Sequence, residues 1–324
     1  MLWPDASYSF HDLNPDTGRF LDDVMAGLSR PQKALPPKYF YDARGCALFE
    51  AICGLPEYYL TRAEIALMRG QVGGMARHLG PGCVLIEYGS GSGHKTRILI
   101  DAISPVAYVP IDIARVQLGA TATEIAREFP GLRVVAVCAD YTGPLALPGL
   151  DDLGACRRIV YFPGSTIGNL TPAEAAVFLA GAREQAGAGG GLLIGVDLKK
   201  DTARLDAAYN DAHGVTAAFN LNLLARINRE LGADFDLSAF RHRAFYDEAG
   251  GRIEMHLESV KAQAVTVDGR VIRFRAGEMI HTENSCKYSV REFQELARAA
   301  GLAPVECWTD AEQLFSVHYL AVPE

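Results

Sequence analysis

The chain has 324 residues, 49% of them hydrophobic, which is enough for one large domain or two of ordinary size. Its formal net charge is -8 and it has no run of lysines and arginines, which argues against a nucleic-acid partner. No apolar stretch approaches the ~20 residues that a membrane span needs, and the N-terminus lacks the pattern of an export signal.

Seven cysteines are scattered along the chain, and no two of them form a CxxC pair. An odd number without regular spacing is typical of reduced thiols, so a cytoplasmic location is expected. The eight histidines include no HxxxH or HExxH motif, and a metal site is therefore not expected.

The first 80 residues indicate helices joined by a proline-rich turn. Helices are predicted over residues 21–28, 45–55 and 62–79. Five short, mostly apolar runs then alternate with helical patterns, at residues 83–88, 107–112, 132–140, 157–165 and 190–198. Such alternation predicts an α/β fold with a parallel, doubly wound sheet, whose strands are buried on both faces. Thr171 and Pro172 mark the start of the helix before the last of these strands.

The pattern changes after residue 200. Two helical stretches, 202–212 and 216–231, precede a segment, 240–286, in which apolar and polar residues alternate. Asp268-Gly269 is placed for a two-residue hairpin turn. A last helix, 290–302, and two final strands would complete the sheet with an antiparallel end. We therefore expect a Rossmann-like domain, 61–198 and 287–324, and a smaller α+β domain, 1–60 and 199–286.

A glycine loop follows the first strand of the sheet, with Gly89, Gly91 and Gly93 at alternate positions. Glycine allows a sharp turn and a close approach of a ligand to the backbone, although a purely structural turn is an alternative. Asp112 ends the second strand, where a carboxylate can accept both ribose hydroxyls of a nucleoside. Asp140 ends the third, beside Tyr141, where the pair can bind an adenine ring. The combination matches a class I methyltransferase that uses S-adenosylmethionine, and a nicotinamide-dependent oxidoreductase is the alternative.

The strand predicted near residues 277–289 raises a different question, because its alternate residues Met279, His281, Glu283 and Ser285 would share one face. That face is either exposed to water or directed at a ligand that carries N–H groups. Asn169 follows the fourth strand, where class I methyltransferases face the transferred methyl group, but Gly-Asn is also ordinary turn chemistry.

Aromatic residues are dense in the N-terminal segment. Either they pack this segment on the sheet, or their rings line a pocket for a cation, which ring faces attract by ~0.5–2 kcal/mol. The residues concerned are Tyr39, Phe40, Tyr41, Phe49, Tyr58, Tyr59 and, from a later helix, Tyr209.

Five long segments carry a resemblance over residues 32 to the end: "LPPKYFYDARGCALFEAICGLPEYYLTRAE", "EYGSGSGHKTR", "FPGSTIGNLTPAEA", "DLKKDTARLDAAYNDAHGVTAAFNLNLLARINREL" and "HTENSCKYS". They resemble the histidine Nα-methyltransferases of ergothioneine biosynthesis. The resemblance implies a methyltransferase domain with a smaller substrate domain, and trimethylation of the α-amino group of L-histidine to hercynine.

The resemblance also implies roles for individual residues. Tyr58, Asn169 and Tyr209 would hold the α-amino and carboxylate groups, and Tyr41 would lie near the amine. Glu283 and Ser285 would bind the imidazole, with Met255 on the adjacent strand. The cofactor S-adenosylmethionine would be bound by Gly89, Lys95, Asp112, Asp140, Tyr141 and Gly164.

This assignment gives Glu283 and Ser285 a reason to share a face, since an imidazole ring presents two nitrogens that a carboxylate and a hydroxyl can distinguish. Alternatives are a methyltransferase for another amino acid, such as tryptophan or a modified histidine, and a non-catalytic binding module. The core of the chain would permit a monomer.

Overall fold

The computed structural model describes residues 8–13, 15, 19–141, 143, 145–148, 150, 153 and 156–324. The chain divides into two compact units. The sheet unit consists of Met1–Pro15, Leu60–Lys199 and Lys287–Glu324, and the insertion unit of Asp16–Tyr59 and Lys200–Cys286. Three of these boundaries lie within one residue of those expected from the sequence.

The sheet unit contains an eight-stranded sheet in the order β1-β5-β4-β3-β6-β7-β14-β13. Its strands are β1 (Tyr8–Asp12), β3 (Val84–Tyr88), β4 (Ala107–Asp112), β5 (Arg133–Cys138), β6 (Arg158–Phe162), β7 (Gly191–Asp197), β13 (Ala303–Thr309) and β14 (Phe315–Ala321). In this order, the first six strands, β1-β5-β4-β3-β6-β7, pair in parallel. Strand β14 is antiparallel to both β7 and β13. The predicted doubly wound sheet with an antiparallel end is confirmed.

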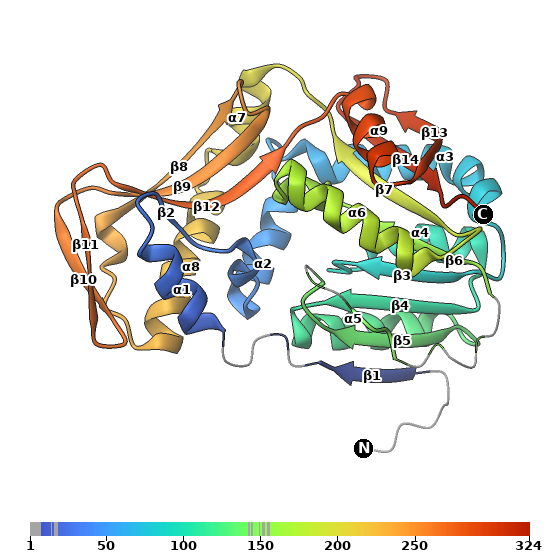
Figure 1. The fold of residues 1–324 in the computed structure, drawn as a ribbon, viewed down its shortest axis with the longest axis horizontal. Coiled ribbons are helices and arrows are strands. Elements are labelled where there is room, and N and C mark those ends of the chain that lie inside the picture. The colour runs from blue at the N-terminus through green and yellow to red at the C-terminus, as the bar shows by residue number, and fades with distance from the viewer. Residues whose placement is uncertain are drawn as a thin grey trace. The chain divides into compact units, whose positions relative to one another are not determined.

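Helices cover both faces of this sheet. They are α3 (Tyr59–Leu79), α4 (His94–Ile103), α5 (Arg115–Glu128), α6 (Pro172–Ala186) and α9 (Val290–Ala299). The α4 and α5 connections extend the sheet to one side of β3, and the α6 connection extends it to the other. Because such crossovers are right-handed, α6 lies on the opposite face from α4 and α5 (Figure 1). The order reverses between β3 and β6, and ligands bind at the carboxyl ends of strands beside such a switch point.

The N-terminal strand corrects the predicted domain division. Residues 1–60 were expected in the smaller domain, and residues 1–7 lie outside the described residues. However, β1 pairs in parallel with β5, with Tyr8 opposite Val134 and Asp12 opposite Cys138. It therefore belongs to the sheet unit. Its sequence is short and half-buried throughout, so it lacks the apolar run that identifies the central strands.

Two segments of the sheet unit lie side by side where the chain leaves this unit and returns to it. Leu198 forms a parallel bridge with Tyr288, and the Lys287 Nζ lies 2.7 Å from Asp197 Oδ2. Both charged side chains are fully buried. A buried ion pair specifies which segments meet, because either charge alone would be costly to bury.

The insertion unit contains a four-stranded sheet in the order β2-β12-β9-β8 and a separate hairpin, β10-β11. Its strands are β2 (Lys33–Ala34), β8 (Phe240–Asp247), β9 (Arg252–Ser259), β10 (Gln263–Val267), β11 (Arg270–Phe274) and β12 (Met279–Cys286). Asp268 and Gly269 both have positive φ, at 47° and 72°, as a type I′ turn requires. The predicted hairpin is therefore confirmed.

The helices of the insertion unit come from both of its chain segments. They are α1 (Phe20–Leu28), η1 (Pro37–Phe40), α2 (Ala43–Cys53), α7 (Thr202–Tyr209), α8 (Val215–Leu231) and η4 (Leu237–Ala239). Among the described residues of the whole chain, no helix combines the length and apolar character that crossing a membrane requires.

Helix α6 begins with a complete capping box, as Thr171 and Pro172 predicted. The Thr171 hydroxyl accepts from the Glu174 N–H at 3.4 Å, and the Glu174 carboxylate accepts from the Thr171 N–H at 2.8 Å. We expect Thr171→Ala to lower the free energy of unfolding by about 1 kcal/mol, as loss of such a cap usually does. Urea unfolding followed by circular dichroism measures this. Thr171→Ser keeps the hydroxyl and should match the parent; an equal loss in both variants would contradict the capping role.

Candidate active site

The glycine loop lies between β3 and α4 in the sheet unit. Gly89, Gly91 and Gly93 have φ values of 72°, 48° and 67°, a left-handed conformation that other residues rarely adopt. A Cβ atom at Gly93 would also lie 2.9 Å from the Thr121 Cγ2 atom. The loop thus requires glycine for its turn, and it exposes backbone at the carboxyl end of the central strand.

Asp112 at the end of β4 holds this loop. One of its carboxylate oxygens accepts from the Gly91 N–H at 3.2 Å, and the other accepts from the Ala114 N–H at 2.9 Å. Burial raises the pKa of Asp112, and the backbone N–H donors oppose that rise. Since a carboxylate oxygen can accept more than one hydrogen bond, Asp112 can serve the loop and a ligand together.

An aromatic cluster lies beside the loop. The Tyr141 ring centroid is 5.3 Å from that of Tyr88 and 6.0 Å from that of Phe162, and Phe178 packs on Phe162 at 4.3 Å. Burial, and then the nearby charges of Asp112 and Asp140, raise the pKa of Tyr141.

A Cβ atom at Gly89 would lie 3.3 Å from the Tyr141 hydroxyl, so that this tyrosine reaches the glycine loop. The predicted residues Gly89, Asp112, Asp140 and Tyr141 are therefore close together. They combine bare backbone, two carboxylates and an aromatic surface.

Glu64 on α3 is a residue that the sequence analysis missed. It is 1% exposed, and its carboxylate accepts from the Lys95 Nζ at 2.6 Å and from the Gly164 N–H at 3.0 Å. It therefore connects two of the residues predicted to bind the cofactor. A glutamate in a helix ordinarily indicates a solvated face, so only its long-range contacts reveal this role.

The turn after β6 is strained in a way that often marks functional sites. Gly164 and Ser165 have positive φ values of 78° and 57°, and Ser165 is not a glycine. The Ser165 hydroxyl accepts from the Asp197 N–H at 2.8 Å, which holds the turn against β7. Asn169 ends the short helix η3 (Thr166–Asn169) that follows. It is half-buried, and in the described part of the chain no hydrogen bond involves its side chain.

In the insertion unit, the predicted tyrosines form one chain of ring contacts. Tyr41 lies 5.8 Å from Phe49, Phe49 lies 6.4 Å from Tyr58, and Tyr58 lies 6.1 Å from Tyr209, measured between ring centroids. The Tyr209 hydroxyl then donates to the Ser285 hydroxyl at 2.7 Å. Residues that are distant in the sequence are thus brought together around one aromatic surface.

Strand β12 departs from the predicted alternation. Its register against β9 shifts between His281, which lies opposite His256, and Glu283, which lies opposite Met255. Two residues of β12 therefore match one step of β9, which is a β-bulge. The prediction that Met279 and His281 share a face with Glu283 and Ser285 is wrong, because the bulge turns the later part of the strand over.

The bulge places Glu283 and Ser285 on a buried face together with Met255. Their exposed fractions are 8%, 4% and 1%, so the alternative of a solvent-exposed face is excluded. Burial raises the pKa of Tyr58 well above its usual value, and the charges of its neighbours, including Glu283 and Tyr41, raise it further. Glu283 therefore lies within electrostatic reach of the tyrosine cluster. Asn284 lies between the glutamate and the serine in the strand and faces the other way, where its side chain contacts His281.

Of the residues predicted to bind substrate, Asn169 lies in the sheet unit. The other six lie in the insertion unit, namely Tyr41, Tyr58, Tyr209, Met255, Glu283 and Ser285. All residues predicted to bind the cofactor lie in the sheet unit.

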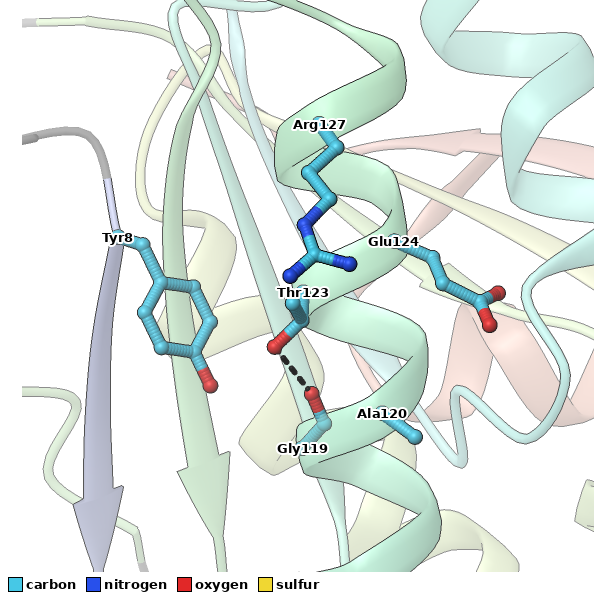
Figure 2. Close-up of a pocket in the computed structure, with 6 residues that line it drawn as sticks. All are labelled: Tyr8, Gly119, Ala120, Thr123, Glu124 and Arg127. Atoms are coloured by element: carbon cyan, nitrogen blue, oxygen red, sulfur yellow. Dashed lines mark hydrogen bonds between the residues drawn. The ribbon is translucent and has the colours of Figure 1, made fainter. Parts of the chain in front are cut away.

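A groove of the sheet unit lies elsewhere. Figure 2 shows that it runs between β1 and α5 and is lined by Tyr8, Gly119, Ala120, Thr123, Glu124 and Arg127. Tyr8 pairs with Val134, near the start of β5, so the groove is at the amino ends of the strands. Ligands of open α/β sheets bind at the carboxyl ends, and we therefore do not assign the groove to the active site.

The doubly wound sheet, its glycine loop and the acids that follow the next two strands define a class I S-adenosylmethionine-dependent methyltransferase. Within this class, the model of the SAM-dependent, histidine-specific methyltransferases matches residues 20–322. The chain belongs to that family.

Curated relatives agree with this assignment. The histidine N-alpha-methyltransferase of Mycolicibacterium smegmatis is 45% identical over 294 residues, which cover 89% of this chain and 90% of that protein. Its counterpart from Mycobacterium tuberculosis is 45% identical over 298 residues, with the same coverage. Ergothioneine biosynthesis protein 1 of Neurospora crassa is 32% identical over 312 residues, which are 93% of this chain but 35% of that longer protein.

Proposed function

We propose that this enzyme transfers methyl groups from S-adenosylmethionine to the α-amino nitrogen of free L-histidine, up to three times, to give hercynine. The relatives named histidine N-alpha-methyltransferase support the substrate and the position of transfer. The observation that carries the proposal is the buried pair Glu283 and Ser285 beside a cluster of tyrosine rings.

The residues of the sheet unit suit the cofactor. Asp112 would accept from the ribose hydroxyls, while Asp140 would accept from the adenine amino group and Tyr141 would pack on the base. The remaining residues, Gly89, Lys95 and Gly164, would line the path of the cofactor's chain. When bound, S-adenosylmethionine supplies a methyl group on a positively charged sulfur, which an amine can displace.

The residues of the insertion unit suit an imidazole. Glu283 would accept from one ring N–H, and the Ser285 hydroxyl, which accepts from Tyr209, can donate its own hydrogen to the other ring nitrogen. A substrate without these nitrogens could not form the two hydrogen bonds, and the bond to the charged carboxylate alone contributes ~1.5–3 kcal/mol. The site would therefore discriminate against amino acids with apolar side chains.

The amine itself needs little help to become a nucleophile. An α-amino group has a pKa of ~8 in peptides, so its deprotonated form is accessible near neutral pH. Tyr58 keeps its proton, because burial raises the pKa of its phenol far above neutrality. We infer that Tyr58, Tyr209 and Asn169 position the amino and carboxylate groups, and that Tyr41 passes a proton from the amine to water. Tyrosine rings stabilise the ammonium form at each stage of methylation.

Mass spectrometry of the products tests the proposal directly. Incubation of the enzyme with S-adenosylmethionine and histidine should give products heavier by 14, 28 and 42 mass units, as expected for one to three methyl groups. Tryptophan and ring-methylated histidines should react poorly in the same assay. Methylation of another amino acid in preference to histidine would overturn the substrate assignment.

A conservative change at Asp112 tests the cofactor site. Asp112→Asn replaces a charged acceptor by a neutral one and places an amide N–H against a backbone donor. Since charged hydrogen bonds exceed neutral ones by about 1 kcal/mol, the Kd for S-adenosylhomocysteine should rise about 5- to 10-fold. Isothermal titration calorimetry measures it. Asp101→Asn, on the exposed side of α4, serves as control, and equal Kd values for both variants would remove Asp112 from the site.

We also propose that the enzyme works as a monomer in the cytoplasm. No disulfide joins any of the seven cysteines in the described part of the chain, which suits a reducing compartment. The exposed large apolar residues include Val116, Val177 and Val271, which come from separate elements and indicate no single docking face. Light scattering of the purified chain would report its mass in solution.

A further inference from the structure

The face of β9 and β12 opposite Glu283 and Ser285 carries a cluster of potential metal ligands. The bulge in β12 brings His281 opposite His256 on β9, and Glu254 precedes His256 by two residues on the same face. One donor atom from each of these side chains lies within 4.8 Å of the others. The ligands come from two strands, which is why no histidine motif in the sequence reveals them.

The distances in the cluster suit a transition-metal ion. Zn²⁺ binds imidazole nitrogen and carboxylate oxygen at ~2.0–2.2 Å in a tetrahedron, so neighbouring donors on one ion lie about 3.3–3.6 Å apart. The His256 Nε2 and Glu254 Oε2 atoms are 2.9 Å apart, in a hydrogen bond that the ion would replace. The His256 and His281 ring centroids are 5.1 Å apart at an interplanar angle of 64°. A contraction of about 1 Å, within the reach of side-chain rotation, would place all three donors around one ion.

Burial also restricts the ring of His256. This residue is 4% exposed. The His256 ring is also held in place, since it stacks on Phe245 at 5.4 Å with an interplanar angle of 4°.

His281 has the kind of partner that orients metal-binding histidines. Its Nε2 lies 3.0 Å from the Asn284 Oδ1, and an amide oxygen only accepts, so the Nε2–H donates. The neutral ring then carries its lone pair on Nδ1. A hydrogen bond from one ring nitrogen to an oxygen commonly fixes the other nitrogen as a ligand.

The charges around the cluster leave it close to neutral. Arg252 donates to the Glu254 Oε1 and lies 3.7 Å from Asp247, so it is paired twice. Arg241 and Arg243 on β8 both pair with Glu258. Glu254 therefore keeps its Oε2 toward His256, and the arginines nearest to it are neutralised by carboxylates.

We propose that Glu254, His256 and His281 bind one divalent transition-metal ion of the Zn²⁺ type, with water completing its coordination. Two imidazoles and one carboxylate favour Zn²⁺, Ni²⁺ or Cu²⁺ over Mg²⁺ or Ca²⁺, which prefer oxygen ligands only. The ion would join β9 to β12 at the bulge that turns Glu283 and Ser285 inward. It would thus stabilise the insertion unit without taking part in methyl transfer.

Equilibrium dialysis of the untagged full-length chain against Zn²⁺, followed by elemental analysis, tests this site. The parent chain should retain one more Zn²⁺ per molecule than the variants His281→Gln and Glu254→Gln. His213→Gln changes an exposed histidine outside the cluster and should retain the parent stoichiometry. Mg²⁺ in excess should not displace the bound Zn²⁺.

Thermal unfolding gives a second readout that does not depend on counting ions. Because an ion that binds only the folded state stabilises it, Zn²⁺ should raise the Tm of the parent and of His213→Gln, but not of His281→Gln or Glu254→Gln. Circular dichroism without metal establishes that each variant is folded. No Zn²⁺ bound by the parent, or equal Zn²⁺ in the parent and in both cluster variants, would overturn the proposal.

Discussion

Replacing Glu283 by alanine is expected to lower kcat/KM for histidine by about 10-fold to 150-fold. The carboxylate is buried on the inner face of β12, opposite Met255 and near Tyr58. A hydrogen bond to a charged group contributes ~1.5–3 kcal/mol, and the variant would also leave the imidazole N–H without an acceptor. Steady-state kinetics with varied histidine measures the loss. Binding of S-adenosylhomocysteine should be unchanged, since the residues proposed for it lie in the sheet unit.

Two further variants separate recognition from folding. Glu283→Gln keeps an acceptor without the charge and should fall between alanine and the parent. Glu278→Ala removes a carboxylate just before the same strand, where it pairs with Lys33, and should leave kcat/KM within about twofold of the parent, because Glu278 is not among the residues proposed to contact the substrate. Histidine kinetics that are unchanged in Glu283→Ala would exclude Glu283 from the substrate site.

The central strands were predictable because their mostly apolar composition indicates that they are buried. β3, β4 and β5 are almost wholly apolar runs of five or six residues, and all three are buried nearly throughout. The parallel, doubly wound arrangement of the sheet followed from the alternation of strands with helices. By contrast, β1 has a mixed sequence, and its place at the edge of the sheet depends on pairing with β5 rather than on its own pattern.

The bulge in β12 could not be predicted, because it is defined by the register against a partner strand. A regular strand over β12 would alternate its faces without interruption, yet the pairing skips one residue between His281 and Glu283. The prediction that Glu283 and Ser285 share a face is correct, since both residues follow the bulge. The predicted face of His281 is wrong, and the cluster of potential metal ligands was missed for the same reason.

The candidate site was anticipated by resemblance more than by physical pattern. No spacing rule places Tyr58 beside Tyr209, or Tyr209 beside Ser285, because their contacts span the whole insertion unit. The sequence analysis did not identify Glu64 and Glu87 for a related reason. Each is an acid within a regular element, where the usual expectation is solvent, and only the tertiary contacts show that both are buried.

Glu87 beneath the glycine loop gives the second large expected effect. It is fully enclosed at the end of β3 and accepts from the Tyr108 hydroxyl and, at 2.7 Å, from the Thr96 hydroxyl of α4. Burial raises its pKa from an ordinary 4.5 to about 8. The folded chain therefore holds this proton between pH 4.5 and 8, while the unfolded chain has released it.

This difference makes the stability of the sheet unit depend on pH. In that window the folded state binds more protons, so its stability falls as the pH rises, by up to about 5 kcal/mol at ~1.36 kcal/mol per pKa unit. Glu87→Gln mimics the protonated acid and has no charge to bury, so it should lose none of that stability. Urea unfolding of both proteins at pH values from 5 to 9 should show the variant gaining steadily on the parent up to pH 8. Parallel stability curves would mean that the pKa of Glu87 is the same in the folded and unfolded chains, and that an ionised carboxylate lies beneath the glycine loop.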